Sequence, residues 1–235
     1  MKTLVLSLVA GAMAAFTMGC TADTASSSEA DNGRVSEPII GGTTDSGDPS
    51  VVGIVLTDSS GSQYICTGSV ISSTKVLTAR HCIEDMVSWE VRVGTNINSP
   101  TSTLAVSKGA YSPDGDIGVL TLSRATSLTP LPYNTGTLDS GDIGASVRAV
   151  GYGSNKTNSG SGTGAGTKRT GNTTIRGLQV DTFSTYNVLC HGDSGGPIFE
   201  NGTIIGITSY GNPANCTGYG YSVRTDLHAD FIQSH

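Results

Sequence analysis

Short runs of alternating apolar and polar residues recur along most of the chain, each bounded by glycine, serine, asparagine or proline. Such alternation predicts half-buried β-strands. The predicted strands are Val51–Leu56, Gln63–Ile71, Val87–Val93, Ile117–Leu122, Val147–Gly151, Thr173–Val180, Ile198–Glu200, Thr203–Ser209 and Gly220–Arg224. Many short strands at this spacing are typical of barrels or sandwiches. Only the segment from Leu227 to Ser234 has helical spacing of its apolar residues, so we expect a short C-terminal helix.

Two segments precede these strands. Residues 1–20 join a basic start to an apolar stretch and small residues before Cys20, an arrangement that predicts an export signal. The apolar stretch is too short to span a bilayer. Residues 21–38 are rich in serine, alanine and acidic side chains, which predicts a disordered tether or pro-segment. We therefore expect the folded domain to comprise residues 39–235.

The cysteines also bear on export. Cys20 resembles the lipid-attachment cysteine of bacterial lipoproteins, although Thr17 and Met18 depart from the usual residues before it. The alternative is ordinary signal cleavage nearby, which leaves Cys20 as a free or mispaired thiol. The remaining cysteines form an even set, and export would place them where disulfides persist, with their pairing left open. They lack paired Cys-x-x-Cys spacing, which disfavours a zinc site.

Composition narrows the class of protein. The chain has 235 residues with 32 glycines, 14% charged and 6% aromatic residues, which favours a turn-rich, mostly β protein of one large or two small lobes. Its formal net charge of −6 disfavours a nucleic-acid or anionic-membrane surface. We expect no nucleic-acid partner, and membrane contact only through a lipidated Cys20.

A glycine-rich turn holds the candidate nucleophile. The run Gly192-Asp193-Ser194-Gly195-Gly196-Pro197 places a serine where glycines permit strained backbone angles. A substrate carbonyl could there approach two backbone amides, which would form an oxyanion hole. The alternative is a glycine-rich hairpin without chemistry. A serine hydroxyl is a weak nucleophile, so catalysis would need a histidine and an orienting acid elsewhere in the chain.

His81 and Asp116 are the candidate partners of Ser194. Of the four histidines, only His81 follows an apolar strand pattern and precedes a cysteine; the alternative is a solvated histidine at a strand end. Asp116 opens an apolar strand, where an unpaired carboxylate would be costly to bury. Asp114 is the rival acid, but it lies in a predicted turn.

The order His81, Asp116, Ser194, with its flanking motifs, resembles the chymotrypsin/trypsin-like serine proteases, and an exported bacterial member is expected. The resemblance spans about residues 39 to 233 and rests on Ile39-Ile40-Gly41-Gly42, Cys66-Thr67-Gly68-Ser69, Gly151-Tyr152-Gly153 and Ser209-Tyr210-Gly211. It implies an all-β fold of two six-stranded antiparallel barrels with a short C-terminal helix. The site would lie in the cleft between the barrels.

The same resemblance implies a monomeric serine endopeptidase that cleaves proteins or peptides through an acyl-enzyme, without metal or cofactor. Gly192 and Ser194 would supply the oxyanion amides, and Ser209 would donate to Asp116. It implies disulfides pairing Cys66 with Cys82 and Cys190 with Cys216.

The resemblance also indicates a substrate pocket, formed by Val188, Leu189, Ser209, Tyr210, Gly211 and Gly220. Trypsin-like members carry an aspartate where this chain has Val188, so we expect a preference for apolar or aromatic side chains. Glycine at 211 and 220 leaves the neck open, while Leu189 could narrow the base and favour medium aliphatic side chains. The alternative is that Val188 is only part of the core.

Activation departs from the family pattern. Members are cut before the residue matching Ile39, and the new amine pairs with the aspartate matching Asp193. Here Pro38 replaces the usual arginine or lysine. Another protease could cut there, trimming could follow a cut at Arg34, or the chain could remain a zymogen.

One further segment is compositionally biased. Residues 153–172 are mostly Gly, Ser, Thr and Asn and cannot bury a core. The resemblance places an exposed loop here, in which Lys168 and Arg169 would be open to proteolysis.

Three functions are compatible with parts of this sequence. An exported endopeptidase, secreted or periplasmic with a precursor that could be lipid-anchored, is favoured. A non-catalytic, membrane-tethered binding member or a permanently inactive zymogen is the alternative; the missing basic cut site supports it and the complete triad opposes it. An α/β-hydrolase esterase would share the Gly-x-Ser-x-Gly pattern of residues 192–196, but such enzymes place the histidine last.

Overall fold

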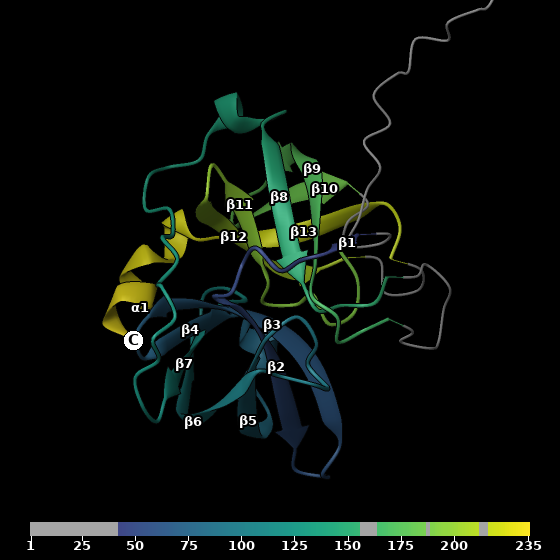
Figure 1. Ribbon diagram of the computed structural model, residues 1–235. Coiled ribbons are helices and arrows are strands. Elements are labelled where there is room, and N and C mark those ends of the chain that lie inside the picture. Colours follow the sequence, from purple (N-terminus) through teal and green to yellow (C-terminus); the bar gives the residue numbers. More distant parts are fainter. Residues whose placement is uncertain (1–41, 156–163, 187–188, 212–215) are drawn as a thin grey trace, which may run out of the picture. The chain divides into compact units, whose positions relative to one another are not determined.

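The computed structural model describes residues 42–155, 164–186, 189–211 and 216–235, whose arrangement Figure 1 shows. The predicted export signal, the tether, Cys20, Ile39 and Val188 lie outside these ranges. No helix in the described part of the chain is long and apolar enough to cross a membrane.

The first half of the chain forms a closed barrel of six antiparallel strands in the order β2-β3-β4-β7-β6-β5. Its strands are β2 Val51–Asp58, β3 Gln63–Ser72, β4 Lys75–Thr78, β5 Met86–Val93, β6 Ser102–Tyr111 and β7 Gly118–Leu122. Strand β6 was not predicted, because most of its side chains are at least partly exposed and it lacks a sustained apolar alternation.

The second half forms the second barrel, coloured green to yellow in Figure 1. Its strands are β8 Ser146–Gly151, β9 Arg169–Leu178, β10 Thr182–Tyr186, β11 Pro197–Glu200, β12 Thr203–Tyr210 and β13 Tyr219–Arg224. The sheet order is β9-β10-β13-β12-β11-β8, and β8 pairs with β9, which closes the ring. The short β1, Thr43–Thr44, adds to β9. The prediction of two six-stranded antiparallel barrels is confirmed.

Helical structure in the described ranges is limited to three 3-10 turns and one α-helix. The turns are η1 Arg80–Cys82, η2 Ser140–Asp142 and η3 Asp226–His228, and the α-helix is α1 Ala229–Ser234. The predicted C-terminal helix is therefore confirmed, although its first turn is the 3-10 turn η3. Ile232 of α1 is buried in the larger core cluster.

That core cluster joins the two barrels. It contains Leu77 and Val119 from the first barrel together with Val150 and Ile207 from the second. Buried apolar side chains of the two barrels therefore form one continuous core.

The prediction for Lys168 is wrong. Lys168 is 1% exposed, and its ammonium donates to the carbonyls of Asp48 and Val51 at 2.5 and 3.0 Å. Burial lowers the pKa of Lys168, an effect that the carboxylates of Asp45 and Asp48 oppose. Strand β9 begins at the next residue, Arg169, so the biased segment ends inside the barrel and not in an open loop.

Candidate active site

The pairing of β4 with β7 brings His81 and Asp116 together. Thr78 at the end of β4 faces Gly118 at the start of β7, so the residues just beyond these ends are neighbours. The imidazole Nδ1 of His81 lies 2.8 Å from Oδ2 of Asp116, and the His81 backbone N–H donates to Oδ1 at 3.0 Å. The rival acid, Asp114, is exposed to solvent.

Ser209 of β12 completes this network from the second barrel. Its hydroxyl donates to Oδ2 of Asp116 at 2.5 Å. Burial by itself would raise the pKa of Asp116, but the hydrogen bonds from His81 and Ser209 outweigh it and hold the pKa of this carboxyl below its ordinary value of 3.8. Asp116 is therefore an ionised carboxylate at neutral pH and fixes the orientation of the His81 ring.

The turn that carries Ser194 is anchored by backbone bonds. Gly192 and Gly195 have φ values of +98° and +81°, which favour glycine over every other residue. The Gly195 N–H donates to the carbonyl of Thr208 at 2.8 Å. His81 and Ser194 line one common cavity.

Thr67 in β3 holds this turn from the first barrel, a role that the sequence reasoning missed. Its N–H donates to the Ser194 carbonyl, and its hydroxyl donates to the Gly192 carbonyl, both at 2.8 Å. The hydroxyl also accepts the N–H of Tyr152 at 3.0 Å. The available signal was a threonine within the Cys66-Thr67-Gly68-Ser69 motif of a predicted strand; in the structure Thr67 is fully buried.

Asp193 is also fully buried, next to Ser194. Its carboxylate accepts the N–H groups of Gly153 and Cys190 at 2.8 and 3.0 Å. A Cβ at Gly151 or Gly153 would overlap this carboxylate, which explains both glycines of the Gly151-Tyr152-Gly153 motif. Burial raises the pKa of Asp193 from 3.8 to about 7, and the two backbone hydrogen bonds only partly oppose it.

The raised pKa of Asp193 makes the stability of the fold depend on pH. Because the folded-state pKa of Asp193 lies above the unfolded value, its contribution to stability is fully present below about pH 4 and is lost as the pH rises toward about 7. A cation placed beside the carboxylate would remove that loss, since it would stabilise the charged form.

Two cavities meet at His191 and Ser194. The first is lined by Leu189, Cys190, His191, Ser194, Thr208, Ser209, Tyr210, Gly211 and Cys216. The second is lined by Leu56, Gln63, Tyr64, Ile65, Cys66, His81, Met86, Ala165, His191, Gly192 and Ser194. Both cavities therefore border the candidate nucleophile.

Most of the predicted pocket residues lie together, with one difference. Leu189, Ser209, Tyr210 and Gly211 line the first cavity, whereas Gly220 is not among its lining residues. A Cβ at Gly220 would lie 2.7 Å from the Leu189 side chain, so Leu189 occupies the space beside this glycine.

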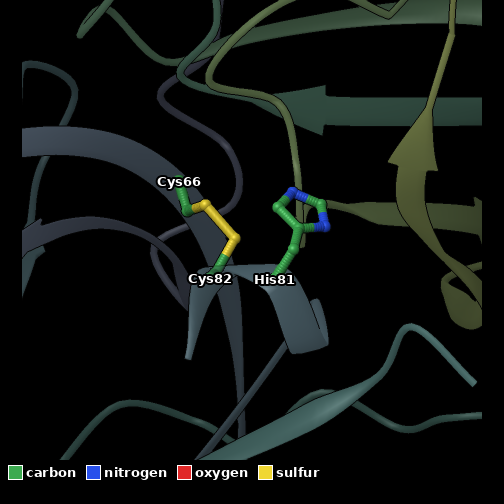
Figure 2. Close-up of side chains that lie close together, drawn as sticks. All are labelled: Cys66, His81 and Cys82. Carbon is green, nitrogen blue, oxygen red and sulfur yellow. A yellow bond between two sulfur atoms is a disulfide. The ribbon is translucent and has the colours of Figure 1, made fainter. Parts of the chain in front are cut away.

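Two disulfides brace the site. They pair Cys66 with Cys82 and Cys190 with Cys216, as the family resemblance implies. Figure 2 shows the Cys66–Cys82 bond beside the His81 ring. These three side chains are close enough together to hold a metal ion, but both sulfurs are bonded to each other and offer no thiolate. The disulfide therefore ties the segment that carries His81 to strand β3.

Comparison with known proteins gives a family match. The family model described as Trypsin matches residues 39–232. Brachyurin from Leptuca pugilator is 28% identical over 207 residues, covering 73% of this chain and 87% of the relative. Chymotrypsin from Phaedon cochleariae is 27% identical over 216 residues, covering 77% and 76%. Both relatives are eukaryotic, so they do not support the expected bacterial origin.

Solved structures share the fold. Human heparin binding protein has a TM-score of 0.69 at 22% identity, covering 83% of this chain and 95% of its own. An HL collagenase structure has a TM-score of 0.70 at 20% identity, covering 82% and 95%. A scabies mite inactivated protease paralogue has a TM-score of 0.68 at 21% identity, covering 79% and 94%.

Proposed function

Since this chain belongs to the trypsin family of serine proteases, we propose that it is an endopeptidase in which Ser194, His81 and Asp116 act as one catalytic unit. Ser194 attacks the scissile carbonyl while His81 takes its proton and then returns it to the leaving amine. Asp116 holds the imidazole in the required tautomer. The observation that carries the proposal is the His81–Asp116–Ser209 hydrogen-bond network, whose His81 lines the same cavity as Ser194.

The backbone N–H groups of Gly192 and Ser194 are assigned to the oxyanion. Removing one such donor typically costs about 10²- to 10³-fold in rate. The anchoring of this turn by Thr67 and by the buried Asp193 supports the assignment, because a fixed turn needs no reorganisation as charge develops.

The class of inhibitor that stops the reaction tests the proposed serine mechanism. Hydrolysis of a casein-like substrate by the activated chain should stop on treatment with a serine-directed phosphonylating reagent. It should persist in a strong metal chelator. A chain that the chelator inactivates and the phosphonylating reagent leaves active would not be the enzyme proposed.

The first cavity is assigned to an apolar or aromatic side chain before the cleaved bond. No acidic residue is present among its described lining residues, and Val188 replaces the aspartate of trypsin-like members. The position of Leu189 beside Gly220 supports medium-sized side chains over the largest ones.

We expect peptides with Leu, Phe or Tyr before the cut bond to be cleaved at least about 10²-fold faster than those with Arg or Lys. An unpaired cation buried in this cavity would cost several kcal/mol. A peptide library measures the ranking, and Val188→Asp should move it toward basic residues, with Val188→Asn as the uncharged control. A wild-type profile led by Arg or Lys would show that the cavity is misassigned.

Activation is assigned to a cut before Ile39 by another protease. The free amine would then supply a cation for the buried Asp193, and an α-amine of pKa about 8 is charged at neutral pH. The complete burial of Asp193 supports the idea, because burial raises the pKa of this carboxyl and a nearby cation would stabilise its charged form.

Trypsin treatment of engineered precursors tests this route. Pro38→Arg should give a precursor that added trypsin activates at least about 10²-fold, because the cut frees Ile39. The wild-type precursor is the matched control, since it has no basic residue directly before Ile39 and the nearest one upstream is Arg34. The double variant Pro38→Arg, Asp193→Asn should be cut but remain inactive, because a neutral amide at position 193 cannot form an ion pair with the amine. Full activity in that double variant would contradict the route.

Export is proposed on the two disulfides, which persist in oxidising compartments. Lipidation of Cys20 would hold the precursor at a membrane until the cut releases a monomeric enzyme. The alternative function, a non-catalytic binding member or an inactive zymogen, is favoured only by Pro38 in place of a basic residue.

A further inference from the structure

A second histidine–aspartate pair, His228 and Asp181, lies outside both cavities of the site. His228 is 7% exposed, and its Nε2 lies 2.7 Å from Oδ1 of Asp181. Asp181 occupies the turn between β9 and β10, and His228 ends η3. Both residues therefore belong to the second half of the chain, and the catalytic steps assigned above use neither of them.

The pair packs against Gly115, the residue directly before Asp116. A Cβ at Gly115 would lie 2.5 Å from Cε1 and Nε2 of His228 and 3.0 Å from Oδ2 of Asp181. Any side chain at 115 would have to displace this pair. The contact is thus made by the bare backbone of the first barrel against two hydrogen-bonded side chains of the second.

Gly115 belongs to a tight turn, residues 112–117, that closes on itself. The Ser112 N–H donates to the Ile117 carbonyl, and the Ile117 N–H donates to the Gly115 carbonyl, both at 2.9 Å. The Arg80 side chain also donates to the carbonyls of Ser112 and Pro113 at 3.3 Å. The turn therefore contacts Arg80 through Ser112 and Pro113 and the His228–Asp181 pair through Gly115.

The pair itself is held in place. The Arg224 N–H donates to the Asp181 carbonyl at 3.0 Å, and the His228 N–H donates to the Thr225 carbonyl at 3.2 Å. The Arg224 side chain donates to Asp226, while the Asp181 carboxylate is hydrogen-bonded to His228. His228 is buried and Asp181 is partly exposed, so the hydrogen bond between them gives the buried imidazole its polar partner.

We propose that His228 and Asp181 are positioning residues for the reaction: they seat the 112–117 turn so that Asp116 meets the His81 ring correctly. The inference rests on the proposed function. Small displacements of catalytic groups are costly, and about 1 Å can lower a rate by about 10²-fold. A purely structural contact between the barrels would instead affect stability and leave the rate of each folded molecule unchanged.

Substitutions at 228 separate these roles. His228→Leu keeps bulk but removes the donor, whereas His228→Gln retains an N–H near the place of Nε2. Per folded active site, we expect His228→Leu to lower kcat about 10-fold or more with KM within about twofold, because neither His228 nor Asp181 lines either cavity of the site. His228→Gln should recover most of the rate. The exposed His235→Gln is the matched control and should behave as wild type.

Amide hydrogen exchange tests the same inference without an activity measurement, because it reports how firmly the 112–117 turn is held. His228→Leu should speed exchange at Ser112 and Ile117 at least about 10-fold, His228→Gln should restore it, and the amides of β2 should be unaffected. If His228→Leu does not fold, Asp181→Ala removes the acceptor at a partly exposed position and should give the same pattern.

The outcomes are distinguishable. Unchanged kcat and unchanged exchange at the turn in the folded variants would overturn the inference, as would a rise in KM with kcat preserved. A wild-type chain that hydrolyses nothing after activation would instead reject the proposed function, while the exchange experiment would still report on the turn.

Discussion

Ser194→Ala should abolish nearly all hydrolysis of a casein-like substrate, with a fall in kcat of about 10⁵- to 10⁶-fold. The hydroxyl is the proposed nucleophile, and nothing else in the described cleft replaces it. The fold should persist because the turn is held through backbone groups, including the Ser194 carbonyl that Thr67 binds. A residual rate about 10³- to 10⁴-fold above water could remain, since the oxyanion amides are untouched.

Two comparisons sharpen this result. The His81→Ala variant should be similarly inactive, and combining it with Ser194→Ala should add little, because the residues act as a unit. Ser60→Ala, at an exposed serine of the first barrel, is the matched control and should retain full activity. Wild-type turnover in Ser194→Ala, measured on protein with an unchanged circular dichroism spectrum, would remove Ser194 from the mechanism.

Asp116→Asn should lower kcat by about 10⁴-fold while substrate binding changes little. The amide has the same shape as the carboxylate, but it has only one acceptor atom. It cannot accept the His81 backbone N–H at one position and the His81 ring and the Ser209 hydroxyl at the other, as the two carboxylate oxygens do. If its N–H₂ group donates to Nδ1 of His81, the imidazole proton moves to Nε2. Nε2 then has no lone pair to take the serine proton. Steady-state kinetics across a pH series would measure the loss.

The pH dependence of stability should also differ between wild type and this variant. The pKa of Asp116 is held below its ordinary value, so its contribution to stability is present above about pH 4 and is lost as the pH falls further. Asp116→Asn should lack this dependence, whereas the exposed Asp114→Asn should keep it. Equal kcat in Asp116→Asn and Asp114→Asn would contradict the role of Asp116.

The sequence predicted the features that are local in the chain. Period-two alternation found β2 and β12, and the glycines around Ser194 identified a turn whose φ angles are indeed positive at 192 and 195. His81 and Asp116 were selected by their places beside strand patterns, and the β4–β7 pairing explains why those places meet.

Features that depend on long-range contacts could not be read in this way. Strand β6 is largely exposed, so its pattern is weak, and Lys168 looked like a loop residue because its partners are carbonyls near β2. The bonds of Thr67 to the Ser194 turn cross more than 120 residues of chain. The contact of His228 with Gly115 likewise joins the two barrels and leaves no local pattern.

The most direct test of the account is to locate the covalent adduct by mass spectrometry. The activated chain is treated with a serine-directed phosphonylating reagent and digested, and each modified residue is identified. The account predicts one adduct, on Ser194, formed rapidly in the wild-type chain and at least about 10³-fold more slowly in His81→Ala. An adduct on another residue, or equal labelling of Ser194 with and without His81, would contradict it.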